Sequence, residues 1–172
     1  RCLLCKGRKQ AVFGDGDPEA RLMFIGEGPG ADEDAQGLPF VGRAGQLLDR
    51  MIAAMGLSRQ QVYIANVVKC RPPGNRAPTP EEATACWPYL AEQIEIVDPE
   101  MIVVLGNAAT KALLGSPIGI TRLRGQWQQF NEIPVMPTFH PSYLLRQYTP
   151  DNRRKVWSDL QAVMERLRLQ NA

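Results

Sequence analysis

Four carboxylates lie within one glycine-rich segment, FIGEGPGADEDAQGLPFVG, at residues 24–42. Glu27 stands between the first glycines, and Asp32, Glu33 and Asp34 follow them. Glycine turns of this kind bring backbone N–H groups close to a ligand, which in phosphate loops is an anion. Carboxylates would repel a phosphate. They are suited instead to activating a water molecule or stabilising a developing cation.

Three interpretations of this turn are open from its residues alone. It can be an ordinary strand-to-helix turn whose acids are solvated. It can be a dinucleotide site, but the G-x-G-x-G spacing fits poorly and Glu27 would face the pyrophosphate. The third interpretation is a pocket for a neutral polar ligand, in which backbone N–H groups bind the carbonyls of that ligand.

Three further side chains could take part in such a pocket. His140 is the only histidine and directly follows the apolar run PVMPTF; a lone histidine is usually structural, but the end of a strand favours a catalytic role. Asn66 interrupts the apolar run VYIANVV, so its amide either bonds neighbouring backbone or reads the polar edge of a ligand. Phe40 is either core or a stacking surface for a planar ligand.

The cysteines form a second candidate site. Cys2 and Cys5 make a C-x2-C pair, and Cys70 and Cys86 make a C-x15-C pair. No secretory signal is visible, which favours a metal site over disulfides. The second spacing is too wide for a standard zinc ribbon, whereas an iron–sulfur cluster tolerates it. A cluster, a zinc ion, and free or disulfide-bonded cysteines all stay open on spacing alone.

Elements that position these residues can be read from the hydrophobic pattern. Continuous apolar runs predict strands at residues 21–26, 62–68, 101–106 and 134–139, and helical spacing predicts helices at 44–55, 79–97, 107–114 and 151–169. Strands that alternate with helices predict an α/β fold: three layers, α/β/α, with a central four-stranded parallel sheet. In such folds ligands bind at the carboxyl ends of the strands. We expect one domain over residues 1–172, with the glycine turn, Asn66 and His140 at one rim.

Charge gives little information about a partner, because the net charge is only +2. No apolar run approaches the roughly 20 residues that span a bilayer, so we expect no membrane association. Basic residues do gather in loops near the predicted rim, where they could bind a phosphate backbone. They are Lys69, Arg71, Arg76, Arg122, Arg124 and Arg146.

Several separated motifs together resemble the family 4 uracil-DNA glycosylases, the iron–sulfur members of the uracil-DNA glycosylase superfamily. The motifs are GEGPG-x3-D, GLPFVGRAGQLLD, VYIANVVKCRPPGNRAPTPEE and HPSYLLR. The resemblance runs from Cys2 to the last helix. It implies a monofunctional enzyme that flips uracil out of DNA and excises it, leaving an abasic site. It also implies a [4Fe-4S] cluster on Cys2, Cys5, Cys70 and Cys86, which would staple the N-terminal segment to residues 70–86.

The resemblance also implies how the base is bound. Phe40 would stack on the extruded uracil, and Asn66 would bond its N3–H and O4. Cytosine presents that edge with donor and acceptor reversed, so it would leave buried groups unpaired. Backbone at Gly28 would bond a uracil carbonyl. His140, neutral, would donate to O2 and stabilise the uracil anion.

Further roles follow from the same resemblance. Glu27 and Glu33 would stabilise the sugar cation and position water, with Asn75 as their partner; we expect Glu33 rather than Glu27 to hold the water. Leu144 would wedge into the gap left by the flipped base. Arg146 would bind a phosphate.

The resemblance also bears on the partners of the protein and its location in the cell. The resemblance implies a prokaryotic, cytoplasmic, nucleoid-associated monomer that acts on uracil in single- or double-stranded DNA. Two functions of other classes compete with it: a DNA-binding module without activity, and a nucleotide-binding or polymerase-associated protein.

Overall fold

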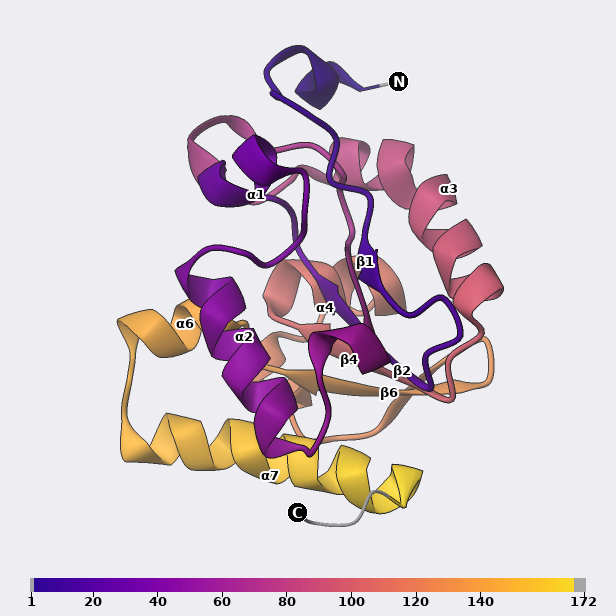
Figure 1. Ribbon diagram of the computed structural model, residues 1–172, viewed down its shortest axis with the longest axis vertical. Coiled ribbons are helices and arrows are strands. Elements are labelled where there is room, and N and C mark those ends of the chain that lie inside the picture. The colour runs from indigo at the N-terminus through magenta and orange to yellow at the C-terminus, as the bar shows by residue number, and fades with distance from the viewer. Residues whose placement is uncertain (1, 169–172) are drawn as a thin grey trace.

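Residues 2–168, which the computed structural model describes, are built around a six-stranded sheet (Figure 1). Its order is β1-β3-β2-β4-β6-β5. The strands are β1 (Asp15–Gly16), β2 (Leu22–Gly26), β3 (Tyr63–Asn66), β4 (Met101–Leu105), β5 (Gln128–Phe130) and β6 (Ile133–Thr138). The four inner strands are parallel, whereas β1 and β5 pair antiparallel at the edges. The predicted parallel core is confirmed.

Neither edge strand has an apolar run: the sequence gives no sign of β1, and for residues 121–130, which contain β5, it leaves open a short hairpin or an irregular segment. Strand β1 is the dipeptide Asp-Gly, and β5 reads Gln-Gln-Phe. Both are defined by pairing to a neighbour rather than by their own sequence. Strand β5 forms a hairpin with β6 through Asn131 and Glu132, both of which have a positive φ.

The four predicted helices are all present, and three shorter ones were missed. The helices are α1 (Ala31–Gln36), α2 (Arg43–Ala54), α3 (Pro80–Val97), α4 (Asn107–Leu114), α5 (Ile120–Leu123), α6 (Pro141–Arg146) and α7 (Pro150–Leu167). Helices α1, α5 and α6 are only four to six residues long, too short to show helical periodicity. Position 169, where the last helix was predicted to end, lies outside the described residues.

The start of α3 follows the predicted capping signal. Thr79 accepts a hydrogen bond from the backbone N–H of Glu82 (3.2 Å), and the Glu82 carboxylate accepts one from the backbone N–H of Thr79 (2.9 Å). Arg76 also donates to both Glu82 oxygens (2.9 and 2.8 Å) and lowers the pKa of Glu82 to about 2. The proline-rich loop before α3 is thereby tied to the helix.

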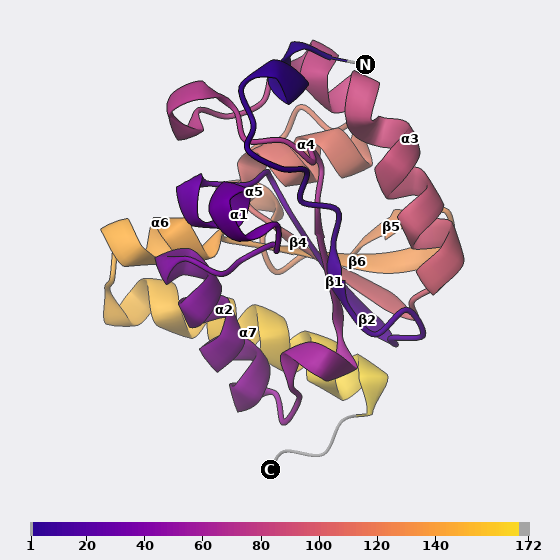
Figure 2. The ribbon, with the colours of Figure 1, turned by 45° about the horizontal axis from the view of Figure 1, so that its top comes forward.

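The sheet is covered on both faces, as its continuous apolar strands require (Figure 2). Alternate residues of β2 show the division: Leu22 and Phe24 belong to the core that α2 and α7 cover, while Met23 and Ile25 belong to the core that α3 and α4 cover. All four side chains are buried. The carboxyl ends of the inner strands are the part of the sheet left for a ligand.

Among residues 2–168, no helix is long and apolar enough to cross a membrane.

Candidate active site

A pocket of about 660 Å³ opens at the carboxyl ends of the inner strands. We call it the mouth. It is lined by nearly all the residues that the sequence singled out for substrate chemistry: Glu27, Gly28, Glu33, Phe40, Asn66, Asn75, His140 and Arg146. Leu144 is the exception. The expectation that the glycine turn, Asn66 and His140 meet at one rim is confirmed.

Asn66 is the last residue of β3 and is 2% exposed. Its Oδ1 is the single buried side-chain polar atom in the described chain that has no hydrogen-bond partner. Leaving such an atom unpaired costs roughly 1–3 kcal/mol. The alternative in which the amide bonds neighbouring backbone is therefore not what the structure shows. The amide is free to bond a ligand in the mouth.

Phe40 lies against Asn66 across Gly26. A Cβ at Gly26 would come within 2.4 Å of the Phe40 ring and 2.6 Å of Asn66 Oδ1, so only glycine allows this approach. Phe40 is 6% exposed as a residue, and the centroid of its ring is 5.5 Å from that of His140. Its backbone φ is +52°, a conformation that costs a bulky residue roughly 1–3 kcal/mol.

His140 follows β6 and caps α6. Its Nδ1 accepts a hydrogen bond from the backbone N–H of Ser142 (3.0 Å), and Ser142 Oγ lies 2.7 Å from the same nitrogen. A backbone amide can only donate, so Nδ1 carries no proton and the neutral ring has its proton on Nε2. The backbone N–H of Ser142 thus fixes the tautomer and leaves Nε2–H as the donor available to a ligand.

Electrostatics keep His140 neutral. Although the ring is partly accessible from the mouth, the protein around it desolvates it and lowers its pKa to about 4. The positive charge of Arg146 adds to this effect, and the negative charge of Glu33 opposes it. Near pH 7 His140 can therefore donate a hydrogen bond but carries no charge.

The end of β6, just before His140, is bonded to helix α7. Thr138 Oγ1 donates to the buried Asp159 carboxylate (2.7 Å), which also pairs with Arg124. This joins β6 to α7 and to the segment after α5. The strand that leads to His140 is thus anchored at its end to α7.

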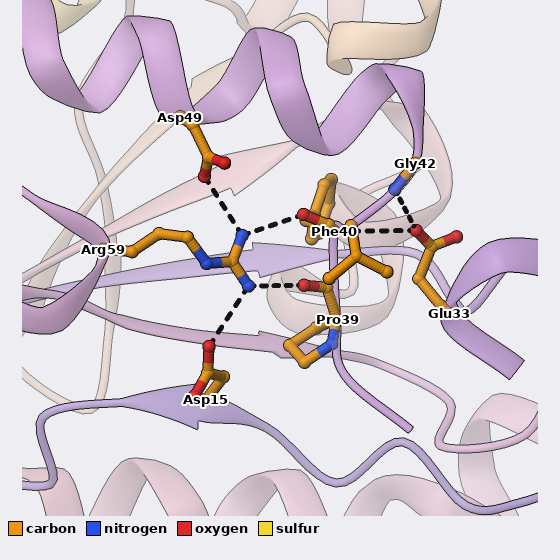
Figure 3. Close-up of polar contacts among 8 residues, drawn as sticks. Asp15, Glu33, Pro39, Phe40, Gly42, Asp49 and Arg59 are labelled. Carbon is orange, nitrogen blue, oxygen red and sulfur yellow. Dashed lines mark hydrogen bonds and ion pairs between the residues drawn. The ribbon is translucent and has the colours of Figure 1, made fainter. Parts of the chain in front are cut away.

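Glu33 uses its carboxylate to hold the loop that carries Phe40 (Figure 3). It accepts hydrogen bonds from the backbone N–H groups of Gly30 (3.0 Å), Val41 (2.9 Å) and Gly42 (2.7 Å). Three donors occupy most of the accepting capacity of a carboxylate. The sequence-based preference for Glu33 as the water-binding carboxylate finds no support in this arrangement.

Glu27 is the carboxylate that stays available. It is half-buried at the mouth, and no hydrogen bond among the described residues engages its side chain. Burial raises its pKa, and the charge of Arg146 partly offsets that increase. A desolvated carboxylate with open acceptor positions is suited to bind a water molecule or a positively charged group.

Asn75, on the proline-rich loop, lines the same pocket as Glu27 and Glu33. Its Oδ1 accepts from Arg71 Nε (2.7 Å), and its Nδ2 lies 4.0 Å from where a Cβ would stand on Gly30. Because Oδ1 is engaged, Nδ2 is the atom that can serve a ligand. The amide can therefore donate to a water or to an oxygen in the mouth.

The two residues of α6 that the sequence singled out, Arg146 and Leu144, have different surroundings. Arg146 is exposed at the edge of the mouth, where its charge acts on both Glu27 and His140. Leu144 is 3% exposed and packs in the core that also contains α2. The neighbouring Tyr143 lines the mouth instead. The structure does not display Leu144 at the surface.

Sequence reasoning missed two residues that organise this site. Ser142 orients His140, and its position two residues after the histidine at a helix start was a usable signal. Arg59 donates to the backbone carbonyls of Pro39 and Phe40 (2.6 and 2.8 Å; Figure 3). Nothing local marked Arg59, because its partners lie about twenty residues away.

The cysteines gather where the N-terminal segment, the residues after β3 and helix α3 meet, next to the proline-rich loop. All four are free: Cys70 and Cys86 are buried, Cys2 is partly buried and Cys5 is exposed. Arg8 Nη1 donates to Cys70 Sγ (3.0 Å). That bond, together with the nearby thiols of Cys70, Cys5 and Cys2, raises the pKa of Arg8.

The donor set matches a thiolate-bound metal group in chemistry and in location. Cys70 and Cys2 also act electrostatically on Cys86, whose pKa is raised mainly by burial. Within the described residues, no three Cys, His, Asp or Glu side chains are already arranged to hold a metal ion. The thiols therefore share one region of the fold without a ligand geometry.

Comparison with known proteins identifies relatives over nearly the whole chain. A family model described as the uracil DNA glycosylase superfamily matches residues 13–161. The type-4 uracil-DNA glycosylase of Thermotoga maritima is 48% identical over 164 residues, covering 93% of this chain and 84% of the relative. The type-4 enzymes of Sulfurisphaera tokodaii and Saccharolobus solfataricus are 47% and 45% identical, covering 96% and 97% of this chain and 78% and 81% of their own.

The low pKa of His140 predicts a specific pH dependence of stability. Between about pH 6.5 and pH 4 the unfolded chain binds a proton on this residue that the folded chain does not. The free energy of unfolding should therefore fall as the pH is lowered through this window, by up to about 3 kcal/mol from His140 alone. Urea unfolding of the parent and of His140→Gln at pH 4 to 7.5 should show a shallower decline in the variant. Parallel curves would contradict the assignment.

Proposed function

The chain belongs to the uracil-DNA glycosylase superfamily, and we propose that it excises uracil from DNA through the residues of the mouth. It is a DNA-repair hydrolase that cleaves the N-glycosidic bond and leaves an abasic site. The observation that carries the residue assignment is the unpaired, buried amide oxygen of Asn66, a residue that lines the mouth together with Phe40 and His140.

Base recognition follows from the arrangement around Asn66. An amide offers one acceptor and one donor, which match the N3–H and O4 of uracil. Cytosine would set acceptor against acceptor and donor against donor, leaving buried groups unpaired. Phe40 supplies a flat apolar surface for the ring. Backbone N–H at Gly28 is the candidate donor to a uracil carbonyl, and a Cβ there would come within 2.7 Å of Val68.

His140 stabilises the leaving group. Cleavage of the glycosidic bond places negative charge on the uracil ring. A donor fixed in advance toward that charge lowers the barrier without reorganising during the reaction. The proton on Nε2 is fixed by the Ser142 contacts to Nδ1, and the low pKa of the ring keeps it neutral. His140 thus acts as a hydrogen-bond donor rather than as a proton donor.

Glu27 and Asn75 serve the sugar side. The sugar develops positive charge as the bond breaks, and a carboxylate stabilises that charge and orients the attacking water. Glu27 has open acceptor positions for both tasks, whereas Glu33 is engaged by the loop. Asn75 Nδ2 can hold the same water from the opposite loop. This exchanges the roles that the sequence suggested for the two glutamates.

The DNA backbone is held at the rim. Arg146 is exposed beside the mouth and is our candidate for a phosphate contact. For Leu144 to enter the duplex it would have to leave the core in which it is buried. We therefore assign Leu144 to anchoring α6 and retain insertion into DNA only as a role that requires rearrangement of this helix.

We further propose that Cys2, Cys5, Cys70 and Cys86 hold a [4Fe-4S] cluster. Three of the four free thiols, those of Cys2, Cys5 and Cys70, lie near Arg8, and Cys86 lies near Cys70 and Cys2. The positive charge of Arg8 would offset the negative charge of thiolates. When bound, such a cluster would supply a covalent staple between the N-terminal segment, the end of β3 and α3. That staple would fix the base of the proline-rich loop that carries Asn75.

Incubation with a uracil-containing oligonucleotide followed by alkali tests the function. The parent should give a strand break at uracil and none at cytosine. Asn66→Asp should lose roughly 100-fold or more in uracil excision, because a carboxylate cannot donate to O4. Asn131→Asp, in the β5–β6 turn at the opposite edge, is the matched control and should behave as the parent. Binding of the DNA without any break would instead support the inactive-module alternative.

The exchange of glutamate roles is tested by two isosteric variants. Glu27→Gln should lower kcat by about 100-fold while the unfolding midpoint stays at or above that of the parent, since a desolvated charge is removed. Glu33→Gln should lower the unfolding midpoint as well as activity, because it weakens the bonds to three backbone N–H groups. If Glu27→Gln keeps full kcat and Glu33→Gln loses it at unchanged stability, the sequence-based order of the two residues is correct.

Metal content tests the cluster. Anaerobically purified protein should be brown and contain about four iron atoms per chain. Cys70→Ser and Cys86→Ser should lose iron and colour and unfold at lower temperature. Thr84→Ala, an exposed change on the same helix as Cys86, is the control and should keep the iron. Colourless protein that contains zinc and no iron would show that the cluster assignment is wrong.

A further inference from the structure

Phe40 holds a backbone conformation that a phenylalanine does not adopt unaided, and the structure shows what enforces it. Its φ of +52° lies in the left-handed region, which large side chains avoid. We propose that Arg59 is a positioning residue that holds Phe40 as a preformed stacking surface for the extruded base. This inference rests on the proposed function, because it assigns Phe40 to uracil.

Arg59 binds the backbone of Pro39 and Phe40 rather than their side chains (Figure 3). Its Nη1 donates to the carbonyl of Phe40 (2.8 Å), and its Nη2 donates to the carbonyl of Pro39 (2.6 Å). Two successive carbonyls are therefore bound by one planar group, which fixes the orientation of the two peptide units that flank the Phe40 Cα. A flexible ammonium could not hold both in this way.

The guanidinium is itself fixed by two carboxylates. Arg59 contacts Asp49 of α2 (3.2 Å) and Asp15 of β1 (3.3 Å), and its side chain is only 14% exposed. Arg59 lies in the short turn that leads into β3. It therefore connects the Phe40 loop to a helix, an edge strand and the start of the strand that ends in Asn66.

The other side of the same segment is equally constrained. Glu33 accepts from the N–H groups of Val41 and Gly42, directly after Phe40. At Gly45, a Cβ would lie 1.9 Å from the Phe40 carbonyl oxygen, so α2 packs against this peptide at backbone distance. Carbonyls bound by a cation and N–H groups bound by an anion leave the backbone at Phe40 no route to a relaxed φ.

Arg59 acts on the site only through Phe40. It does not line the mouth, whereas the Phe40 ring lies against Gly26 and the Asn66 amide, with the His140 ring 5.5 Å away. A change in the Phe40 backbone would tilt the ring toward or away from Asn66. Because Arg59 fixes the backbone of Phe40 when the protein folds, DNA binding does not have to order the stacking surface.

A double-mutant cycle separates positioning from general stability. Arg59→Met keeps the apolar stem and should lower kcat/KM for uracil excision by roughly 10- to 100-fold. In a Phe40→Leu background the same change should have less than about a twofold effect, because there is no ring left to position. Arg21→Met is the matched control: Arg21 also binds a carboxylate and a backbone carbonyl, but of Glu100 and Leu167, far from the mouth. It should leave kcat/KM unchanged.

The position of the Phe40 ring can also be tested without measuring catalysis, by ¹⁹F spectroscopy of the folded protein. The chain has five phenylalanines, so ¹⁹F spectra of fluorophenylalanine-labelled protein are simple, and Phe40→Leu identifies the Phe40 signal. Arg59→Met should shift or split that signal, and Arg21→Met should not. If Arg59→Met does not fold, Arg59→Lys takes its place in both experiments.

The outcomes distinguish this inference from the proposed function. Equal effects of Arg59→Met with and without the Phe40 ring, or an unchanged ¹⁹F signal, would overturn the positioning role while uracil excision by the parent stands. A parent that does not excise uracil would refute the proposed function, whatever the spectra show.

Discussion

The backbone from Pro39 to Gly42 is held between a carboxylate and a guanidinium, and the shape of the mouth depends on that constraint. Glu33 binds the N–H groups on one side of Phe40, and Arg59 binds the carbonyls on the other. Neither interaction involves the Phe40 ring. Together they set where the ring stands relative to Asn66 and His140, and so they determine the width and chemistry of the pocket.

The same constraint explains how two glutamates six residues apart differ in their chemistry. Both belong to the glycine-rich turn, but Glu33 is saturated by backbone donors and Glu27 is desolvated and unbonded. Environment, rather than residue type, makes one carboxylate a structural acceptor and leaves the other with open acceptor positions. His140 follows the same rule, since its neighbours fix both its tautomer and its neutral state. The polar groups of the mouth are thus already oriented before a reaction places charge there.

Two parts of the chain far from the mouth support its walls. The Asp159 contacts hold the end of β6 and hence His140. The cysteine region lies where the N-terminal segment meets the end of β3 and α3, so it borders the loop that carries Asn75. Lys69 connects this region to Asn66: its buried Nζ donates to the Asn66 carbonyl (2.8 Å) and to the Gln93 side chain (2.5 Å). Structural and reactive residues therefore form one continuous framework.

Much of this protein could be predicted from local patterns. Apolar runs located the four parallel strands, and because parallel strands end at one edge, the segments after them had to converge. The positions of Asn66, Phe40, Asn75 and His140 at one mouth follow from that geometry and from the motifs. The start of α3 was equally local, since Thr79 and Glu82 cap the helix within four residues.

What the tertiary structure alone decided concerns contacts between segments distant in sequence. No local signal shows that Glu33 binds the N–H groups of Val41 and Gly42, that Leu144 faces the core, that β1 pairs with β3, or that Arg59 holds Phe40. Sequence by itself determined which elements form and where their ends meet, because periodicity and capping act over a few residues. Which polar atoms are occupied and which stay free depends on long-range packing, and that distinction selects Glu27 and Asn66 as the groups left for a substrate.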